Sequence, residues 1–395
     1  MNNSSYPPIV GTAEPSPAER LLACADLLAC PQCGLPLAAP IADPGAGDPP
    51  ARTLRCPHGH SFDLAKQGYV SLLTGASTKM TGDTPAMLDA RTAFQAAGHF
   101  APIAAALAET VAAALPHRDT ASDPVTGSDA AVFGADSPTA ATSPTHPAAQ
   151  QHDGTADPAS SHSPGRPVKV TPTRHRRLRP GTLAPGMSVT SASAARLATT
   201  LLSAGRGPAL LEIGAGTGYY LAAVLDAVPG ARGVALDVSK AAVRRAARAH
   251  ARGGAVLADA WRGLPVRDGV MGAVVSVFAP RNADEVARVL GEEGRFVVVT
   301  PTSRHLGELI EPLGMVSVDA AKADRLAESL GERFELVRHD AVEYTMELSH
   351  EDVANVAAMG PSAFHAVEGR TEQIAALPDP MPVTASVTIS VYRPR

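Results

Sequence analysis

Three glycines at alternate positions mark residues 210–220, LLEIGAGTGYY, as a candidate ligand-binding loop. An apolar stretch runs directly into Gly214, Gly216 and Gly218, and a helical pattern begins near Tyr219. Glycine is needed where a backbone turns with positive φ or lies against a ligand, and open α/β sheets bind ligands at the carboxyl ends of their strands. The predicted cofactor-binding residues of this loop are Gly214, Ala215, Gly216, Thr217 and Gly218.

Carboxylates accompany the loop. Glu212 precedes it, and this acid together with the G-x-G-x-G spacing favours an uncharged adenosine with an amino-acid tail over a pyrophosphate. Asp237 ends the next apolar segment, where a carboxylate can accept both ribose hydroxyl hydrogens. Asp259, followed by Ala260, ends a third segment and can meet the adenine amine. The combination resembles the class I S-adenosylmethionine-dependent methyltransferases; another Rossmann-like nucleotide binder is the alternative.

A cysteine cluster near the amino terminus predicts a metal site. Cys30-Pro-Gln-Cys33 is a C-x-x-C pair, and Cys56-Pro-His58-Gly-His60 follows it. Two thiolates in C-x-x-C can reach one ion, and a second pair from a neighbouring hairpin completes a tetrahedron. The residues therefore predict a Cys₃His zinc site in which the fourth ligand is either His58 or His60. A closed site of this kind is structural, because no position is left open for a substrate.

Free thiols without function and a redox C-x-x-C are the competing interpretations of these cysteines. A redox pair belongs in a thioredoxin-like βαβ context, which the sequence around residues 30–33 does not offer. Cys24 lies in the apolar stretch LLACADLLAC and is predicted to be a small packed residue rather than a ligand.

Alternating strand and helix patterns must position these residues. Short apolar strands, each followed by a helical pattern, predict βαβ units and a parallel doubly wound sheet, the α/β Rossmann-like fold of a class I methyltransferase. Two later β-like runs, 336–345 and 383–392, predict an antiparallel edge on that sheet. The predicted strands are 209–213, 233–237, 255–259, 273–278 and 295–300, and the helices between them include 239–251 and 282–290.

Composition divides the chain into segments. From residue 116 the sequence is rich in Ala, Ser, Thr, Pro, Asp and Gly without periodicity, so it cannot bury enough apolar surface to fold. A run from Arg166 to Arg179 is basic and contains no acid. The predicted segments are a disordered tail at 1–20, a small zinc-ribbon domain at 21–75, a connector of two short helices at 76–115, a disordered low-complexity insertion with the basic run at 116–190, and the methyltransferase domain at 191–395.

Overall composition excludes several classes of protein. No run approaches the roughly 18 apolar residues that a membrane helix needs, and the start MNNSSYPPIV lacks the regions of a secretion signal. No membrane partner and a cytoplasmic location are therefore predicted. A formal net charge of -5 argues against a uniformly basic nucleic-acid coat, so any RNA site must be local.

An ordered series of motifs closely resembles the family of 23S rRNA (guanine-N1-)-methyltransferases that includes the tylosin-resistance type. The motifs are the zinc cluster, HSFDLAKQGYVSLL, TGDTPAMLDARTAFQAAGHFAPI, LEIGAGTGYY, LDVSK and FAPRNADEVARVL. The resemblance covers most of the chain outside residues 1–20 and the linker near 116–190, where the family has a short connection. It implies that the zinc ligand is the histidine of C-x-x-x-H, which selects His60, and that Phe100 and His305 lie near the methionine end of the cofactor.

The resemblance also implies a function. The family uses S-adenosylmethionine to methylate guanine N1 in a hairpin of domain II of 23S rRNA at the peptide exit tunnel, and holds one structural Zn²⁺. One branch confers resistance to macrolides such as tylosin. The high Ala, Gly, Pro and Arg usage suggests a GC-rich coding source, which slightly favours that branch. The family further suggests a homodimer. RNA affinity is expected from the zinc module and the basic residues Arg52, Arg55, Lys66, Lys79 and Arg91. The run 166–179 is either a further RNA contact or simply a solvated linker.

Candidate catalytic residues lie after the fourth predicted strand, in FAPRN. Guanine N1 must approach the methyl group in line and lose its proton, so the site must hold a splayed-out base. Phe278 is predicted to stack on a base, and Arg281 or Asn282 to hydrogen-bond its O6. The alternatives are that Phe278 is a core residue and that Arg281 is a solvated charge at a helix start.

Two rival functions remain. A small-molecule methyltransferase acting on quinones or natural products would not need a zinc ribbon beside the catalytic domain. A zinc-ribbon binding protein with an inactive methyltransferase fold is disfavoured by the intact Gly214, Gly216, Gly218 and Asp237.

Overall fold

The computed structural model describes residues 14–39, 52–75, 78, 80–116, 207–317, 328–360, 363 and 369–395. All of them belong to one compact unit of the chain. The predictions made for residues 1–13, for Lys79 and for the insertion and basic run at 117–190 lie outside the described residues.

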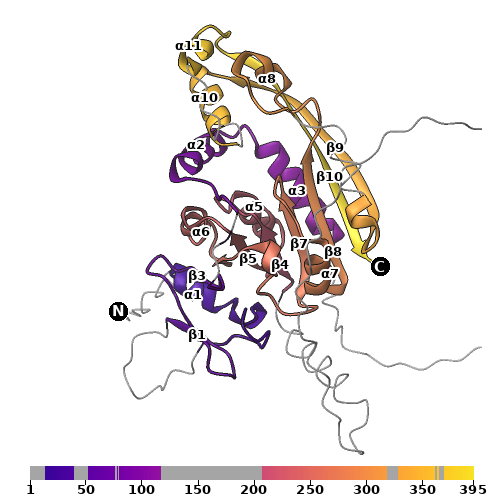
Figure 1. Cartoon of the computed structure of the whole chain (residues 1–395). Helices are drawn as coiled ribbons and strands as arrows, with labels where there is room; N and C mark the ends of the chain where they lie inside the picture. Colours follow the sequence, from indigo (N-terminus) through magenta and orange to yellow (C-terminus); the bar gives the residue numbers. More distant parts are fainter. Residues whose placement is uncertain are drawn as a thin grey trace, which may run out of the picture. The chain divides into compact units, whose positions relative to one another are not determined.

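An eight-stranded mixed sheet forms the centre of this unit, in the order β3-β6-β5-β4-β7-β8-β10-β9 (Figure 1). Strands β3 to β8 of that order run parallel, whereas β10 runs antiparallel to both β8 and β9. The predicted α/β class, parallel sheet and antiparallel edge are confirmed. The strands are β3 (Val70–Ser71), β4 (Ala209–Ile213), β5 (Arg232–Asp237), β6 (Gly253–Leu257), β7 (Met271–Val277), β8 (Leu290–Pro301), β9 (Phe334–Leu348) and β10 (Met381–Pro394).

Both faces of the sheet are covered. In β4, Leu210 packs into the hydrophobic cluster on one face and Leu211 into the cluster on the other, because successive strand side chains point to opposite faces. This double burial explains why the parallel strands are continuous apolar runs. Helices α3 (Ala101–Ala114), α5 (Tyr219–Ala227) and α6 (Lys240–Ala246) cover the first face, and α1 (Pro17–Leu22) and α7 (Ala283–Val289) cover the second.

The amino-terminal module packs directly on the sheet. It contains α1, η1 (Ala25–Leu27) and the antiparallel hairpin of β1 (Thr53–Arg55) and β2 (Ser61–Asp63). Its β3 pairs with β6, and Leu21 and Leu54 share one hydrophobic cluster with Val256 of β6. The module and the catalytic domain therefore have a common core.

The predicted disordered tail at 1–20 needs a correction at its end. Residues 17–20 form most of α1, because Ser16 and Glu19 make a reciprocal capping box and Pro17 occupies the first turn. The cap satisfies backbone amides that the helix itself leaves without partners. Order therefore begins before residue 21.

The connector forms two helices, as predicted. These are α2 (Pro85–Ala96), capped by Thr84, and α3, and the turn between them contains Gly98 with a φ of 85°. Among the described residues no single helix is long and apolar enough to cross a membrane; α2 and α3 would meet that length and composition only as a pair, which bends by 83°.

Strands β9 and β10 extend beyond the rest of the sheet. They pair along their whole length, whereas β8 pairs only with residues 387–392 of β10. Val383 of β10 and Val353 of α10 share a hydrophobic cluster. In Figure 1 this end of the hairpin carries α8 (Gly307–Leu313), α10 (His350–Ala358) and α11 (Arg370–Ala375), next to α2.

Candidate functional site

The predicted metal ligands converge. The side-chain donors of Cys30, Cys33, Cys56 and His60 all lie within 4.8 Å of one another. His60 Nδ1 lies 3.3 Å from Cys56 Sγ and 3.5 Å from Cys30 Sγ, and Cys33 Sγ lies 3.7 Å from Cys56 Sγ. Three thiols and one imidazole that can surround a single point fit tetrahedral Zn²⁺.

The same geometry decides between the two histidines. His58 is exposed and does not belong to the cluster, so His60 is the fourth ligand, as the family resemblance implied. Cys24 is buried, and its thiol donates to the carbonyl oxygen of Gly233 at 3.4 Å. The prediction that Cys24 is a packed residue is confirmed.

The glycine loop connects β4 to α5 with three residues of positive φ: Gly214 at 70°, Gly216 at 55° and Gly218 at 81°. The N–H groups of Gly214 and Ala215 both donate to Leu236 of β5, which fixes the loop on the neighbouring strand. A Cβ on Gly214 would lie 2.5 Å from Ala279 Cβ, so the loop also touches the segment after β7. The predicted loop thus lies at the carboxyl edge of the sheet, where a ligand can approach the backbone.

Asp237 lies at the end of β5 and holds this loop. Its Oδ2 accepts from Gly216 N–H at 2.8 Å, and its Oδ1 accepts from Ser239 N–H at 2.8 Å. Burial raises the pKa of this carboxyl, and these two N–H donors oppose the rise. Each carboxylate oxygen keeps a free lone pair, which suits the predicted contact with ribose hydroxyls.

Glu212 is in a different environment from Asp237. It is 1% exposed, and its Oε2 accepts from Leu221 N–H in the first turn of α5 at 3.0 Å. Burial raises the pKa of Glu212 to about 8, and the charge of Asp237 adds to the rise. The side chain is therefore mainly protonated at neutral pH and links the loop to its helix.

Asp259 and Ala260 follow β6, as predicted. Asp259 Oδ1 accepts from Trp261 N–H at 3.0 Å, and its Oδ2 accepts from the Thr78 hydroxyl at 2.7 Å. Asp259 thereby begins the short helix η2 (Ala260–Arg262) and also binds the connector.

The connector lies over the cofactor loop, which the sequence did not indicate. A Cβ on Gly216 would lie 2.8 Å from Nη1 of Arg91, and Thr217 donates its hydroxyl hydrogen to Gln95 Oε1 at 2.7 Å. Ser239, which begins α6, donates its hydroxyl hydrogen to the backbone oxygen of Asp83 at 2.7 Å. Residues of α2 and the segment before it are therefore part of this site.

Arg91, one of the residues from which RNA affinity is expected, is held by other parts of the protein. Its guanidinium pairs with Asp83 and donates to the Met359 carbonyl oxygen at 2.7 Å, and its side chain is only 24% exposed. Tyr220, nearby at the start of α5, has a buried hydroxyl without a partner among the described residues. A held cation and an unpaired hydroxyl beside a glycine loop fit the charged amino-acid tail of the predicted cofactor.

Three aromatic rings predicted separately form one cluster. The ring centroid of Phe278 lies 5.7 Å from that of His305 and 6.5 Å from that of Phe100. The ring centroids of Phe100 and His305 are 5.9 Å apart. Phe278 is 42% exposed, which excludes a purely core role, and it has a φ of 53°, outside the usual range for a phenylalanine. We call Phe100, Phe278 and His305 the ring cluster.

His305 is neutral at physiological pH. Burial lowers the pKa of its imidazole to about 4, and Nδ1 lies 3.2 Å from the N–H of Ser386, from which it accepts a hydrogen bond. The remaining proton is therefore assigned to Nε2.

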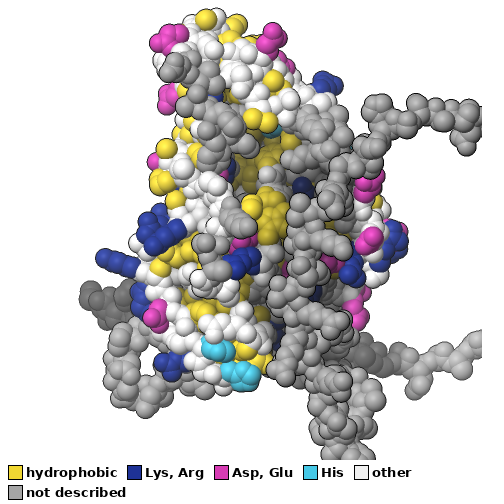
Figure 2. Space-filling model, viewed as in Figure 1, with side chains coloured by type: hydrophobic (Ala, Val, Ile, Leu, Met, Phe, Trp, Pro, Cys, Tyr) yellow, Lys and Arg dark blue, Asp and Glu magenta, His cyan; other side chains and the backbone are white. Residues whose placement is uncertain are grey.

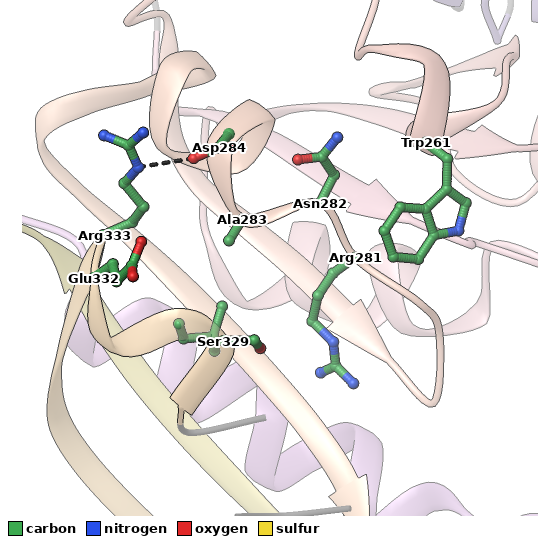
Figure 3. A pocket seen from close by; sticks show the side chains of 9 residues that line it. Trp261, Arg281, Asn282, Ala283, Asp284, Ser329, Glu332 and Arg333 are labelled. Atoms are coloured by element: carbon green, nitrogen blue, oxygen red, sulfur yellow. Dashed lines mark hydrogen bonds and ion pairs between the residues drawn. The ribbon is translucent and has the colours of Figure 1, made fainter. Parts of the chain in front are cut away.

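The other two predicted catalytic residues do not join the ring cluster. Arg281 and Asn282 line a cavity of about 310 Å³ with Trp261, and no residue of the ring cluster lines it (Figure 3). Asn282 Oδ1 accepts from Glu285 N–H at 3.4 Å and thereby begins α7. Phe278 thus belongs to the ring cluster, whereas Arg281 and Asn282 line the neighbouring cavity, and the shared role of the three residues on one base stays a prediction.

Basic side chains gather beside α6. Figure 2 shows Lys and Arg side chains on the flank of the viewed face that carries α6 and α1 in Figure 1. Lys240 and Arg244 lie four residues apart on one side of α6, and Arg248 follows in the turn after it. All three are exposed and form no ion pair with a described residue.

Comparison with known proteins agrees with both parts of the structure. A family model described as "RlmA, N-terminal" matches residues 28–77, and one described as "Methyltransferase domain" matches residues 210–296. A relative from Micromonospora griseorubida, provisionally named 23S rRNA (guanine-N(1)-)-methyltransferase, is 40% identical over 368 residues, which cover 93% of this chain and 97% of the relative. The 23S rRNA (guanine(748)-N(1))-methyltransferase of Streptomyces fradiae is 35% identical over 368 residues, covering 93% of this chain and 96% of the relative. With such identity over nearly the whole of both relatives, the chain belongs to the family of 23S rRNA (guanine-N1-)-methyltransferases.

Proposed function

We propose that this protein transfers a methyl group from S-adenosylmethionine to N1 of a guanine in 23S rRNA. Family membership supports the substrate class. The observation that carries the chemistry is the contact between Ala279, which follows Phe278 of the ring cluster, and Gly214 of the cofactor loop. A base stacked at the ring cluster would lie next to the cofactor.

Bound S-adenosylmethionine supplies an electrophilic methyl group on a sulfonium. Asp237 would accept the ribose hydroxyl hydrogens and Asp259 would meet the adenine amine. Arg91 would pair with the carboxylate of the amino-acid tail, because its guanidinium lies against Gly216. The backbone of the loop, free of side chains at Gly214, Gly216 and Gly218, allows this close approach.

The ring cluster would hold the guanine in place. The half-exposed ring of Phe278 offers a stacking surface for a splayed-out base. Neutral His305 can donate its Nε2 proton in a hydrogen bond. Methyl transfer to N1 would break the S–CH3 bond of the sulfonium, leave S-adenosylhomocysteine and release the N1 proton to water. Donation to O6 would stabilise the negative charge that builds on the ring as this proton leaves.

The exposed basic side chains on α6 and directly after it would contact phosphates of the RNA. Lys240, Arg244 and Arg248 form a row on the segment that Ser239 begins, directly after the cofactor carboxylate Asp237. Exposed Arg55 and Lys66 of the zinc module add to this surface. Each phosphate contact contributes affinity that falls with salt concentration.

Several finer points extend the proposal. We infer that the modified guanine lies in a hairpin of domain II at the peptide exit tunnel, and that its methylation confers tylosin-type resistance; the S. fradiae relative is named for N1 methylation of guanine 748. Ribosomal RNA as substrate supports a cytoplasmic location. A homodimer, suggested by the family resemblance, can be tested by light scattering of the purified full chain.

A competition assay tests the proposed function. The full chain, loaded with zinc, is incubated with tritiated S-adenosylmethionine and either a transcript of 23S rRNA domain II or a panel of phenols and quinones. Label should enter the RNA and none of the small molecules. Transfer to a small molecule, with none to RNA, would support the rival small-molecule activity and refute the proposal.

A further inference from the structure

We propose that the cavity between η2 and the start of α7 is a second nucleobase subsite, which takes a guanine flanking the methylated one. The subsite is formed by Trp261, Arg281 and Asn282. This inference rests on the proposed rRNA substrate.

The first argument is the exposed indole. Trp261 is the single tryptophan of the chain, and 53% of it is exposed. Its backbone is fixed, because its N–H donates to the buried carboxylate of Asp259. A large flat ring held at the mouth of a cavity is a stacking platform that accepts any base.

The second argument is the state of Arg281. Its Nη1 is buried and has no hydrogen-bond partner among the described residues. A buried guanidinium donor without a partner is costly, and a ligand that accepts from it removes that cost. Because the planar guanidinium donates two parallel hydrogen bonds, it matches the O6 and N7 acceptors of guanine.

The charges around the cavity favour a neutral ring over a phosphate. In Figure 3, Asp284, Glu332 and Arg333 lie on the side opposite Trp261 and Arg281. Arg333 is paired with Asp284 at 2.7 Å, and the second acid, Glu332, would repel an anion. A base offers acceptors without a net charge, so it fits both walls.

Position along the chain links this cavity to the reaction. Phe278 of the ring cluster and Arg281 are separated by three peptide units, at most about 11 Å of extended chain. One loop can therefore contact two nearby nucleotides, one at the ring cluster and the other at the cavity. The second contact would set the sequence context that the enzyme accepts.

Binding of a synthetic domain II hairpin RNA to the full chain, saturated with S-adenosylhomocysteine, tests the subsite. The RNA should quench Trp261 emission, and Trp261→Ala should weaken RNA binding about 10-fold through lost stacking. Arg281→Lys keeps the charge but loses the fork, and should also weaken binding about 10-fold. Arg338→Lys, at an exposed arginine paired with Asp340 on β9, is the control for this exchange and should change the RNA affinity less than about 2-fold.

Base substitution in the RNA identifies the occupant. One guanine beside the methylated one is replaced by 7-deazaguanine, which lacks the N7 acceptor. This replacement should weaken binding of the RNA to the wild-type chain several-fold, and it should hardly change binding to Arg281→Lys. Arg281→Lys binding as tightly as wild type, or equal deazaguanine penalties in both proteins, would overturn the subsite. A third result would also overturn it: S-adenosylhomocysteine alone quenches Trp261 emission, and Trp261→Ala binds the cofactor more weakly. The cavity would then hold the adenine of the cofactor.

The same samples separate this inference from the proposed function. Methylation of the hairpin by wild-type protein without these binding effects would refute the subsite alone. Absence of both binding and methylation would refute the subsite and the proposed function together.

Discussion

Replacing Arg91 by alanine should weaken binding of S-adenosylhomocysteine and leave binding of 5′-methylthioadenosine nearly unchanged. The guanidinium lies against Gly216 and is held there by Asp83 and the Met359 carbonyl, with 24% of the side chain exposed. A hydrogen bond to a charged partner in a partly buried site contributes about 1.5–3 kcal/mol, which corresponds to roughly 10- to 100-fold in affinity. Methylthioadenosine has no carboxylate, so its affinity should not fall in the variant.

Isothermal titration calorimetry of both ligands against wild-type and variant proteins measures the difference. The chain offers a matched control in Arg245→Ala. Arg245 is also 24% exposed and also pairs an acid, Asp89, between α6 and α2, but it does not contact the glycine loop. This control should bind both ligands within about 2-fold of wild type, because an isolated ion pair of this kind contributes at most about 1 kcal/mol.

The two ligands distinguish the possible roles of Arg91. A loss confined to S-adenosylhomocysteine means that Arg91 recognises the amino-acid tail. An equal loss for both ligands would show that Arg91 only holds α2 over the site, and no loss for either would remove Arg91 from the cofactor site altogether.

Three further predictions follow from the zinc site, the buried acid and the insertion. Cys33→Ser and His60→Ala should lose the single zinc measured by atomic absorption, whereas His58→Ala should keep it; loss of zinc only in His58→Ala would contradict the ligand set. Because burial raises the pKa of Glu212 to about 8, above its value of 4.5 when unfolded, the folded state binds the extra proton and the free energy of unfolding falls as pH rises between these values. Glu212→Gln should flatten that fall in urea titrations, and an unchanged slope would refute the raised pKa. Deletion of residues 120–160 should keep near-normal methyl transfer to naked 23S rRNA, since loop-closure entropy grows only slowly with the length of an insertion; loss of activity with intact circular dichroism would give the insertion a role in recognition.

The zinc site and the glycine loop could be read from the sequence because their geometry is local. Cys30 and Cys33 lie in one turn, and Cys56 and His60 lie in another. The site forms when these two turns come together. Gly214 and Asp237 end adjacent parallel strands, so the topology alone brings them to the same edge. Choosing between His58 and His60 needed either the family resemblance or the structure.

Contacts between distant segments could not be predicted in this way. Arg91 reaches Gly216, and Thr78 reaches Asp259, across more than a hundred residues of chain, and nothing in the local pattern of α2 indicates which element it covers. A motif such as TGDTP, polar and rich in turn formers just before a helix, was the available signal for a functional segment.

The separation of Arg281 and Asn282 from Phe278 has a similar cause. Sequence proximity suggested one shared base, whereas Phe278 packs with Phe100 and His305, and Arg281 and Asn282 line the cavity beside Trp261. Neither the positive φ of Phe278 nor the lack of a partner for Nη1 of Arg281 among the described residues can be inferred from residue types alone.

Nucleoside mass spectrometry of methylated RNA tests the central claim most directly. A domain II transcript is incubated with the full chain and S-adenosylmethionine, digested to nucleosides and compared with the same reaction run with Asp237→Ala. We expect 1-methylguanosine from the wild-type reaction, a reverse-transcription stop at one guanine because N1 methylation blocks base pairing, and far less product from the variant. Methylation at any other guanine atom, or no methylated nucleoside with zinc-loaded and folded protein, would contradict the account.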